Sequence, residues 1–414
     1  MGARSLAMTT SRVIEDLKAD GATGRKFRGA ALGSSRIAKI ESFAVPPRWV
    51  FIRVETDDGA VGWGEASLEG HSAAVEGAFS GLRERFIGAD PFRIEEIWQI
   101  AYRLGFYRGG PVLMSAMSGL DQALWDIKGR VLGVPVWQLM GGMVRERIQC
   151  YSWVGGDNPG EVRNAARERK RQGFKAVKLN ATAQLEWLTS PRELDAVAER
   201  VREVQAEGLD VALDFHGRLH KPMARQLVQR LQPLGLMFVE EPLLSENIDA
   251  LDQLARTSSI PIAMGERLYT RWDFKPFFER SILDIAQPDL SHAGGISEVK
   301  RIAAFAEAHD VALAPHCPLG PLAFAAVLQV GASTPNFVIA EMSLGIHYNN
   351  PDADLLTYIK NREVFSIHDG YVTTPPGAGL GIELDEDLVR QVAKEYRPWS
   401  NPVWRNKDGS VAEW

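Results

Sequence analysis

The sequence contains very little cysteine, with two residues in a chain of 414. Cys150 and Cys317 lie far apart and form no closely spaced pair. This excludes a disulfide framework and argues against a zinc or iron–sulfur site built on cysteine. The sequence therefore predicts a reducing, cytoplasmic setting. It also lacks any run of about 18 apolar residues, which a membrane-spanning helix requires.

The sequence also has no large excess of positive or negative charge. The 53 acidic and 47 basic residues give a net charge of -6, and the basic residues form no stretch. This argues against nucleic acid as a partner. The apolar content of 45% and the charged content of 24% are ordinary for a globular protein, and the length allows two or three domains.

The first 34 residues carry no pattern of a folded element or of a targeting signal. They contain no apolar core of a signal peptide, and Glu15, Asp16 and Asp20 argue against an organelle transit peptide. We expect residues 1–34 to be a disordered leader, or the result of a start site set too early, with Met8 as the alternative.

Residues 35–140 combine a strand pattern with a helical one. Residues 50–54 alternate as a strand, residues 57–59 have turn chemistry, and residues 61–65 return as a second strand. From about residue 71 the period becomes helical, with one apolar stripe formed by Leu120, Ala123, Leu124 and Ile127. The sequence predicts an N-terminal α+β domain here.

Residues 141–349 alternate between strand and helix patterns with a period near 25 residues. Eight parallel strands joined by right-handed crossovers close into a barrel. The expected strands are residues 148–154, 174–179, 211–214, 237–240, 261–265, 282–287, 311–315 and 337–341. Residues 350–414 are irregular, and their apolar Trp399, Trp404 and Trp414 predict a C-terminal segment that packs back on the N-terminal domain.

Three carboxylates end three successive predicted strands. Asp214, Glu240 and Glu266 each close a short apolar run and are evenly spaced along the chain. A single acidic residue at a strand end is more often a cap or a surface charge. Three at this spacing would converge at one barrel face, where oxygen ligands suit a hard cation such as Mg²⁺.

A histidine and an aspartate end the next two predicted strands. Asp289 ends the sixth strand and His316 the seventh, so the carboxylate can accept a hydrogen bond from one ring nitrogen and fix the tautomer. His216 follows Asp214 by two residues and points to the same face. A lone buried histidine is more often structural, but a histidine–aspartate pair beside a metal site favours catalysis.

These motifs resemble those of the enolase superfamily, in its mandelate-racemase-like branch. The resemblance is carried by Asp214-Phe-His216-Gly-Arg, Val-Glu240-Glu-Pro, Gly-Glu266-Arg, Gln-Pro-Asp289-Leu-Ser-His-Ala-Gly-Gly and Ala-Pro-His316. From about residue 35 to the last residue, further motifs resemble the family of D-galactonate dehydratases. These are Phe106-Tyr-Arg-Gly-Gly-Pro, Trp125-Asp-Ile-Lys-Gly, Tyr151-Ser-Trp-Val-Gly-Gly-Asp, Gly345-Ile-His-Tyr-Asn and Ser410-Val-Ala-Glu-Trp414.

The resemblance implies an α/β fold, a modified TIM barrel of the (β/α)₇β type beneath an N-terminal α+β capping domain that sets specificity. It implies a homo-oligomer that binds Mg²⁺ and a small-molecule sugar acid. By the same resemblance, the metal ligands are Asp214, Glu240 and Glu266. His316 is the base, Asp289 activates it, His216 is the acid, and Glu341 stabilises charge in the transition state.

One departure from the branch bears on the reaction. Racemases of this branch carry Lys-x-Lys at the second barrel strand, where this chain has Lys178-Leu179-Asn180. Asn180 cannot remove a proton from carbon. This argues against a two-base racemase. The resemblance implies dehydration of D-galactonate to 2-dehydro-3-deoxy-D-galactonate and water, and we expect Asn180 to be a substrate contact.

Capping-domain contacts and some alternatives stay open. Tyr107 and Arg108 are expected either to line the sugar pocket or to pack. The alternative functions are dehydration of another aldonate, such as gluconate or a pentonate, an aldonate epimerase or racemase, and an inactive metal-binding homologue.

Overall fold

The computed structural model describes residues 34–156, 161–181, 185–349 and 353–413. A disordered leader is predicted over residues 1–34, and residues 1–33 of it lie outside the described residues. From Arg36 onward the chain forms one unit. None of its described helices is both long enough and apolar enough to cross a bilayer.

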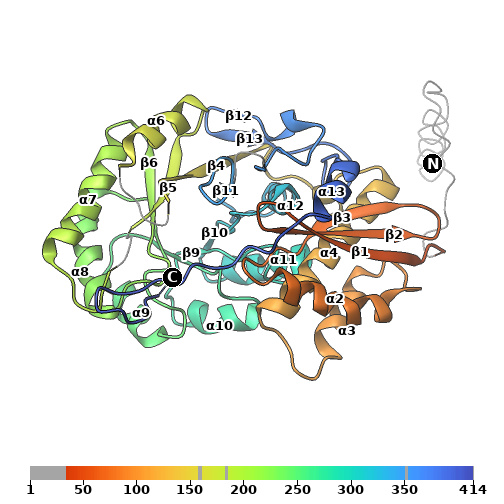
Figure 1. Cartoon of the computed structure of the whole chain (residues 1–414), viewed down its shortest axis with the longest axis horizontal. Helices are drawn as coiled ribbons and strands as arrows, with labels where there is room; N and C mark the ends of the chain where they lie inside the picture. The colour runs from red at the N-terminus through yellow and green to blue at the C-terminus, as the bar shows by residue number, and fades with distance from the viewer. Residues whose placement is uncertain (1–33, 157–160, 182–184, 350–352, 414) are drawn as a thin grey trace, which may run out of the picture. The chain divides into compact units, whose positions relative to one another are not determined.

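The N-terminal part of this unit is a three-stranded antiparallel sheet covered by helices (Figure 1). The strands β1 (Ile37–Val45), β2 (Trp49–Thr56) and β3 (Val61–Glu65) pair in chain order, and α2 (Ser72–Phe86), α3 (Ile94–Arg103) and α4 (Pro111–Leu132) follow. The predicted stripe of α4 is buried. A Cβ atom at Gly64 would lie 2.1 Å from the carbonyl oxygen of Gly119, so glycine allows β3 to lie directly on α4.

The second part is a closed barrel of eight parallel strands. Its hydrogen-bonded order runs from β4 through β10, and β11 pairs with β4. A parallel bridge between Leu313 and Phe337 closes the remaining gap beside β10. The strands are β4 (Arg147–Val154), β5 (Ala176–Asn180), β6 (Asp210–Asp214), β7 (Val239–Glu240), β8 (Ile262–Met264), β9 (Ile285–Ala286), β10 (Ala312–Leu313) and β11 (Ala340–Met342).

A helix follows each of the first seven barrel strands, which gives the (β/α)₇β pattern. These helices are α6 (Arg163–Arg171), α7 (Pro191–Gln205), α8 (Lys221–Leu231), α9 (Ile248–Ala255), α10 (Arg271–Glu279), α11 (Gly295–Glu307) and α12 (Pro321–Ala332). Short helices are α5 (Val136–Leu139), η1 (Gln232–Leu234) and η2 (Arg362–Phe365). The predicted fold class, a modified TIM barrel with an N-terminal α+β domain, is confirmed.

The interior of the barrel is packed with side chains. Tyr151 and Phe238 fill it edge to face, with ring centroids 6.0 Å apart, between the alanines of neighbouring strands. A barrel of this kind is a packed core with no room for a ligand. Chemistry must therefore take place at one end, beyond the last residues of the strands.

The C-terminal segment contacts both parts. The hairpin of β12 (Ile367–His368) and β13 (Tyr371–Thr373) pairs with the start of β4. Helix α13 (Glu386–Ala393) packs on β1, where Arg390 Nη2 lies 3.0 Å from Glu41 Oε2.

Candidate active site

Three strand ends bring three carboxylates together. Asp214 is the last residue of β6 and pairs in register with Glu240, the last residue of β7, while Glu266 lies just beyond β8. One oxygen from each carboxylate lies within 4.8 Å of the others. Asp214 Oδ2 makes no hydrogen bond to the described residues. A buried, all-oxygen set with a spare acceptor fits a hard divalent cation.

Lys178 on β5 partly neutralises this acidic cluster. Its buried Nζ lies 2.6 Å from Glu240 Oε1, 3.1 Å from Glu341 Oε1 and 3.4 Å from Asp214 Oδ2. Burial raises the pKa of Glu240, and the nearby carboxylate of Asp214 raises it further. One ammonium group therefore leaves an excess of buried negative charge, which a bound cation would reduce.

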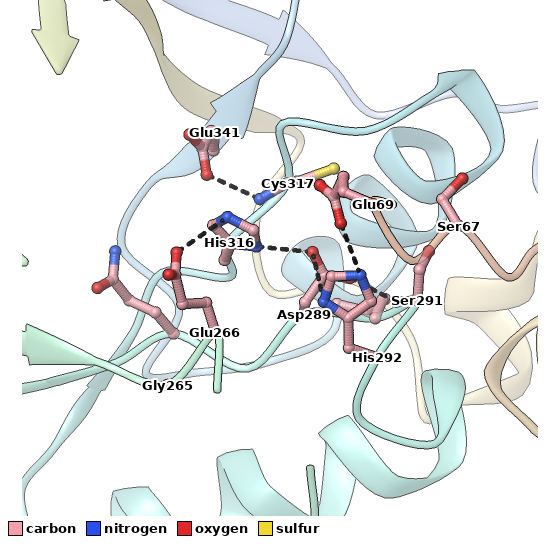
Figure 2. Close-up of polar contacts among 12 residues, drawn as sticks. Ser67, Glu69, Gly265, Glu266, Asp289, Ser291, His292, His316, Cys317 and Glu341 are labelled. Carbon is pink, nitrogen blue, oxygen red and sulfur yellow. Dashed lines mark hydrogen bonds and ion pairs between the residues drawn. The ribbon is translucent and has the colours of Figure 1, made fainter. Parts of the chain in front are cut away.

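His316 and Asp289 form a hydrogen-bonded pair beside the same cluster (Figure 2). His316 Nδ1 lies 2.8 Å from Asp289 Oδ2, and His316 Nε2 lies 3.1 Å from Glu266 Oε2. The backbone N–H of Ser291 donates to Asp289 Oδ1 at 2.6 Å and holds that carboxylate in place. Burial alone would lower the pKa of His316, but the carboxylates of Glu266 and Asp289 raise it to about 10.

His216 reaches the cluster through an unusual backbone conformation. Its φ of 52° lies in the left-handed region, and its backbone N–H donates to Asp214 Oδ1 at 2.8 Å. The ring Nδ1 lies 3.1 Å from the same oxygen. The turn after β6 therefore folds this imidazole back over the carboxylate that precedes it, which leaves its Nε2 for another partner.

Asn180 lies on β5, the strand that carries Lys178 and pairs with β6, and Glu341 lies on β11, which pairs with β4. Glu341 on β11 accepts hydrogen bonds from the backbone N–H of Cys317 at 2.8 Å and from the indole of Trp153. Asn180 ends β5, and its Nδ2 donates to the carbonyl of Gly156 at 2.9 Å. Its buried Oδ1 makes no hydrogen bond to a described residue, so it is available as an acceptor.

A cavity of about 190 Å³ lies over these groups. His216, Glu266 and His316 contribute to one wall, while the N-terminal part of the unit supplies Arg48 and Glu69. The remaining lining residues are Leu68, Trp153, Arg267, Tyr269, His292, Pro318, Ile346 and Tyr348. The cavity therefore presents three histidines and one of the clustered carboxylates to a small ligand.

Tyr107 and Arg108 do not line this cavity. They lie in the loop between α3 and α4, where Tyr107 is 83% exposed, and they border a separate surface hollow. The structure instead brings Arg48 and Glu69 to the site. No sequence motif marked these two, because their place depends on how the N-terminal sheet packs against the barrel.

Comparison with known proteins agrees with this architecture. Residues 44–141 match the N-terminal domain of the mandelate racemase/muconate lactonizing enzyme family, and residues 161–388 match the enolase C-terminal domain-like family. The chain belongs to the enolase superfamily. Members of the superfamily bind a divalent metal ion, and the three-carboxylate cluster has the donor set for one.

Two similar enolase-superfamily sequences are D-galactonate dehydratases. The protein from Ralstonia pickettii is 49% identical and the one from Cronobacter sakazakii is 50% identical, and each alignment spans 92% of this chain and 100% of the relative. A similar solved structure is an enolase from Agrobacterium radiobacter bound to sodium and L-malate. It has a TM-score of 0.83 and 32% identity, over 91% of this chain and 99% of that one.

Proposed function

We propose that this protein is a Mg²⁺-dependent D-galactonate dehydratase. It would convert D-galactonate to 2-dehydro-3-deoxy-D-galactonate and water. The observation that carries the proposal is the hydrogen-bonded pair of His316 and Asp289. Its histidine lines one cavity with His216, beside the three-carboxylate cluster. The relatives at 49% and 50% identity support the choice of substrate.

Asp214, Glu240 and Glu266 would hold the Mg²⁺ ion. When bound, this ion supplies positive charge that stabilises the negative charge growing on the substrate carboxylate as C2 loses its proton. Lys178 forms ion pairs with two of these three ligands, at 2.6 Å with Glu240 and at 3.4 Å with Asp214. The ligand set is thereby preorganised by the fold.

His316 acts as the base on the C2 proton. Its Nδ1 faces Asp289, so Nε2, the nitrogen next to Glu266, is the one that would take the proton. A carboxylate partner fixes the tautomer and raises the basicity of an imidazole, and a well-placed general base contributes a factor of about 10²–10⁴. Asp289 therefore acts through His316.

His216 acts as the acid on the departing 3-hydroxyl. Its Nδ1 is directed to Asp214, so its other nitrogen is the one that can deliver a proton into the cavity that it lines. Loss of the C2 proton and of the 3-hydroxyl leaves an enol, which tautomerises to the 2-keto acid. Glu341 assists by holding Lys178 and the backbone of Cys317 next to the base.

Asn180 separates this reaction from racemisation. It occupies the position of the second base of racemases and cannot take a proton from carbon. Its free Oδ1 can accept a hydrogen bond from a substrate hydroxyl. We also infer from the two free, buried cysteines that the protein works in the cytoplasm, and from the resemblance that it assembles as a homo-oligomer.

A panel of sugar acids tests the proposed function. D-galactonate, gluconate and a pentonate are each incubated with the protein and Mg²⁺, and formation of a 2-keto-3-deoxy acid is measured, with EDTA as the metal-free control. We expect D-galactonate to have the highest kcat/KM and EDTA to abolish turnover. Tenfold better turnover of another aldonate would contradict the choice of substrate, and C2 epimerisation without loss of water would contradict the reaction.

A further inference from the structure

Two buried carboxylates of the N-terminal part lie at the junction with the barrel and do not line the cavity. They are Glu65, the last residue of β3, and Asp121 on α4, which are 0% and 3% exposed. Helix α4 packs on β3 and on α11, and β3 also contacts α12 (Figure 1). Helices α11 and α12 follow the two strands whose ends carry Asp289 and His316. The proposed reaction uses neither of the two carboxylates.

Glu65 caps helix α12 from a distant part of the chain. The N-cap residue of α12 is Gly320, which has no side chain to accept a hydrogen bond. The backbone N–H of Gly320 instead donates to Glu65 Oε1 at 2.8 Å, and that of Ala323 donates to Glu65 Oε2 at 3.0 Å. Ala323 is the third residue of the helix, where an N-cap side chain usually bonds. The hydroxyl of Ser67 donates to Oε1 at 2.7 Å and orients the carboxylate.

Asp121 caps helix α11 in the same way. The N-cap residue of α11 is again a glycine, Gly294. The third residue of the helix, Ser297, donates its backbone N–H to Asp121 Oδ2 at 3.0 Å and its hydroxyl to Oδ1 at 2.5 Å. The neighbouring Gln122 donates from Nε2 to the carbonyl of Leu290 at 2.9 Å, in the loop that leads to this helix. The N-terminal part therefore supplies the caps of both helices.

A carboxylate at each helix start has a physical cost and a physical purpose. Burial raises the pKa of Glu65 and of Asp121 to about 7, although the hydrogen bonds that they accept lower it. The first residues of both helices are buried, so water cannot satisfy their N–H groups. A carboxylate suits this position, because its charge also interacts favourably with the positive end of the helix dipole.

Short buried segments connect both caps to the catalytic pair. Residues 317–319 alone separate His316 from the N-cap of α12, and residues 290–293 separate Asp289 from that of α11. Every residue of the two segments is buried. A close-packed interior has low compressibility and transmits strain. A displacement of either helix start should therefore reach Asp289 or His316.

We propose that Glu65 and Asp121 are positioning residues, which hold the Asp289–His316 pair in its hydrogen-bonded geometry through the two helix caps. This inference rests on the proposed function, in which His316 is the base. A misplacement of about 1 Å can cost about a hundredfold in rate, so loss of a cap should lower kcat. The three metal ligands lie at the ends of other strands, so the affinity for Mg²⁺ should stay the same.

The variants Glu65→Gln and Asp121→Ala test the two caps. The amide of Glu65→Gln leaves one acceptor oxygen for two backbone N–H groups, and Asp121→Ala removes both acceptors. Asp126 provides the matched controls, Asp126→Asn and Asp126→Ala. It is another fully buried carboxylate on α4, and it accepts from the backbone N–H of Trp63 at 3.0 Å and of Leu380 at 2.8 Å, so it caps neither helix.

The experiment measures kcat and KM with D-galactonate and Mg²⁺ for each protein. We expect Glu65→Gln and Asp121→Ala to lower kcat by about ten- to hundredfold, with KM and the Mg²⁺ affinity within about threefold of the wild-type values. The two Asp126 variants should keep the kcat of the wild-type protein.

Proton NMR provides a readout that loss of stability alone would not move. It records the resonance of the proton between His316 Nδ1 and Asp289, which is identified by its absence in His316→Asn. We expect this resonance to move upfield in Glu65→Gln and in Asp121→Ala, because a longer hydrogen bond deshields its proton less. Partial unfolding would lower the intensity of the resonance and leave its position unchanged.

The outcomes separate the two proposals. An unchanged kcat, a resonance that stays at the wild-type position, or equal losses in the Asp126 controls would overturn the positioning role and leave the dehydratase in place. Should Glu65→Gln not fold, Ser67→Ala replaces it, since this variant removes one hydrogen bond from the same carboxylate; a smaller upfield shift is then expected. Absence of D-galactonate turnover by the wild-type protein would overturn the proposed function. The NMR comparison needs no substrate and would still decide whether the caps hold the pair.

Discussion

Replacement of Lys178 by methionine should destabilise the metal-free protein severely. The Lys178 side chain is fully buried and its Nζ lies within 3.4 Å of Asp214, Glu240 and Glu341. Methionine has a similar length and no charge. The variant would leave these carboxylates buried without the ammonium group that pairs with them. A buried charge that has lost its partner is what makes breaking a buried ion pair costly.

The loss of stability can be estimated from other buried ion pairs. Removing one partner of a buried ion pair destabilises a protein by about 3–5 kcal/mol. Since each 1.4 kcal/mol is a factor of about ten, the ratio of folded to unfolded protein should fall by two to more than three orders of magnitude. A divalent cation at the three-carboxylate cluster restores positive charge. Mg²⁺ should therefore stabilise the Lys178→Met variant by more than it stabilises the wild-type protein.

Chemical unfolding in guanidinium chloride, with EDTA or with Mg²⁺, measures both effects. Lys300→Met is a suitable control, because Lys300 Nζ donates to the carbonyl of Ser333 at 3.1 Å and to Thr334 Oγ1 at 3.3 Å and forms none of the ion pairs of Lys178. Equal stability of Lys178→Met and wild type in EDTA would refute the charge argument. So would a smaller response of the variant to Mg²⁺.

Three further results are expected. Asp289→Asn should lower kcat about 10²–10⁴-fold with Mg²⁺ binding intact, because His316 loses the carboxylate that fixes its tautomer and raises its basicity; kinetics and calorimetry check this. His216→Asn should still exchange the C2 proton of D-galactonate without losing water, as deuterium incorporation would report. Burial raises the pKa of Glu41, but Arg390 and Lys39 lower it to about 2. Arg390→Met should therefore lower the free energy of unfolding by about 1 kcal/mol at pH 7, and by progressively less from pH 4.5 towards pH 2. Urea unfolding at several pH values measures this.

The strand-end positions of the site could be predicted from the sequence, because residues spaced by one strand and one helix lie next to each other in a barrel. Residues that end successive parallel strands meet at one edge, whatever the loops between them do. Asp214, Glu240 and Glu266 follow this rule and lie together in the structure. The contact of His316 with Asp289 has the same origin.

The strand lengths were less predictable. The expected strand 237–240 has regular strand structure over Val239–Glu240, and the expected strand 282–287 has it over Ile285–Ala286. Their apolar runs also include buried residues such as Phe238 and Ile282. Apolar patterning reports burial, and burial extends beyond the residues that have regular strand structure.

The contacts between the N-terminal part and the cavity could not be predicted. Arg48 and His292 lie on the same wall although more than two hundred residues separate them in the chain. Their proximity arises from side-chain packing between two parts of the fold. No period or spacing in the sequence reports which residues meet across such a packing contact. The same reason explains why Tyr107 and Arg108, in a motif of the family, lie outside the cavity.

Proton NMR of D-galactonate in D₂O, with the protein and Mg²⁺, tests the central claim most directly. The account predicts a 2-keto-3-deoxy acid carrying solvent deuterium at C3, no product with EDTA, and no product with His316→Asn, which should still bind Mg²⁺. Turnover by His316→Asn, or product formation that is independent of the metal, would contradict the account.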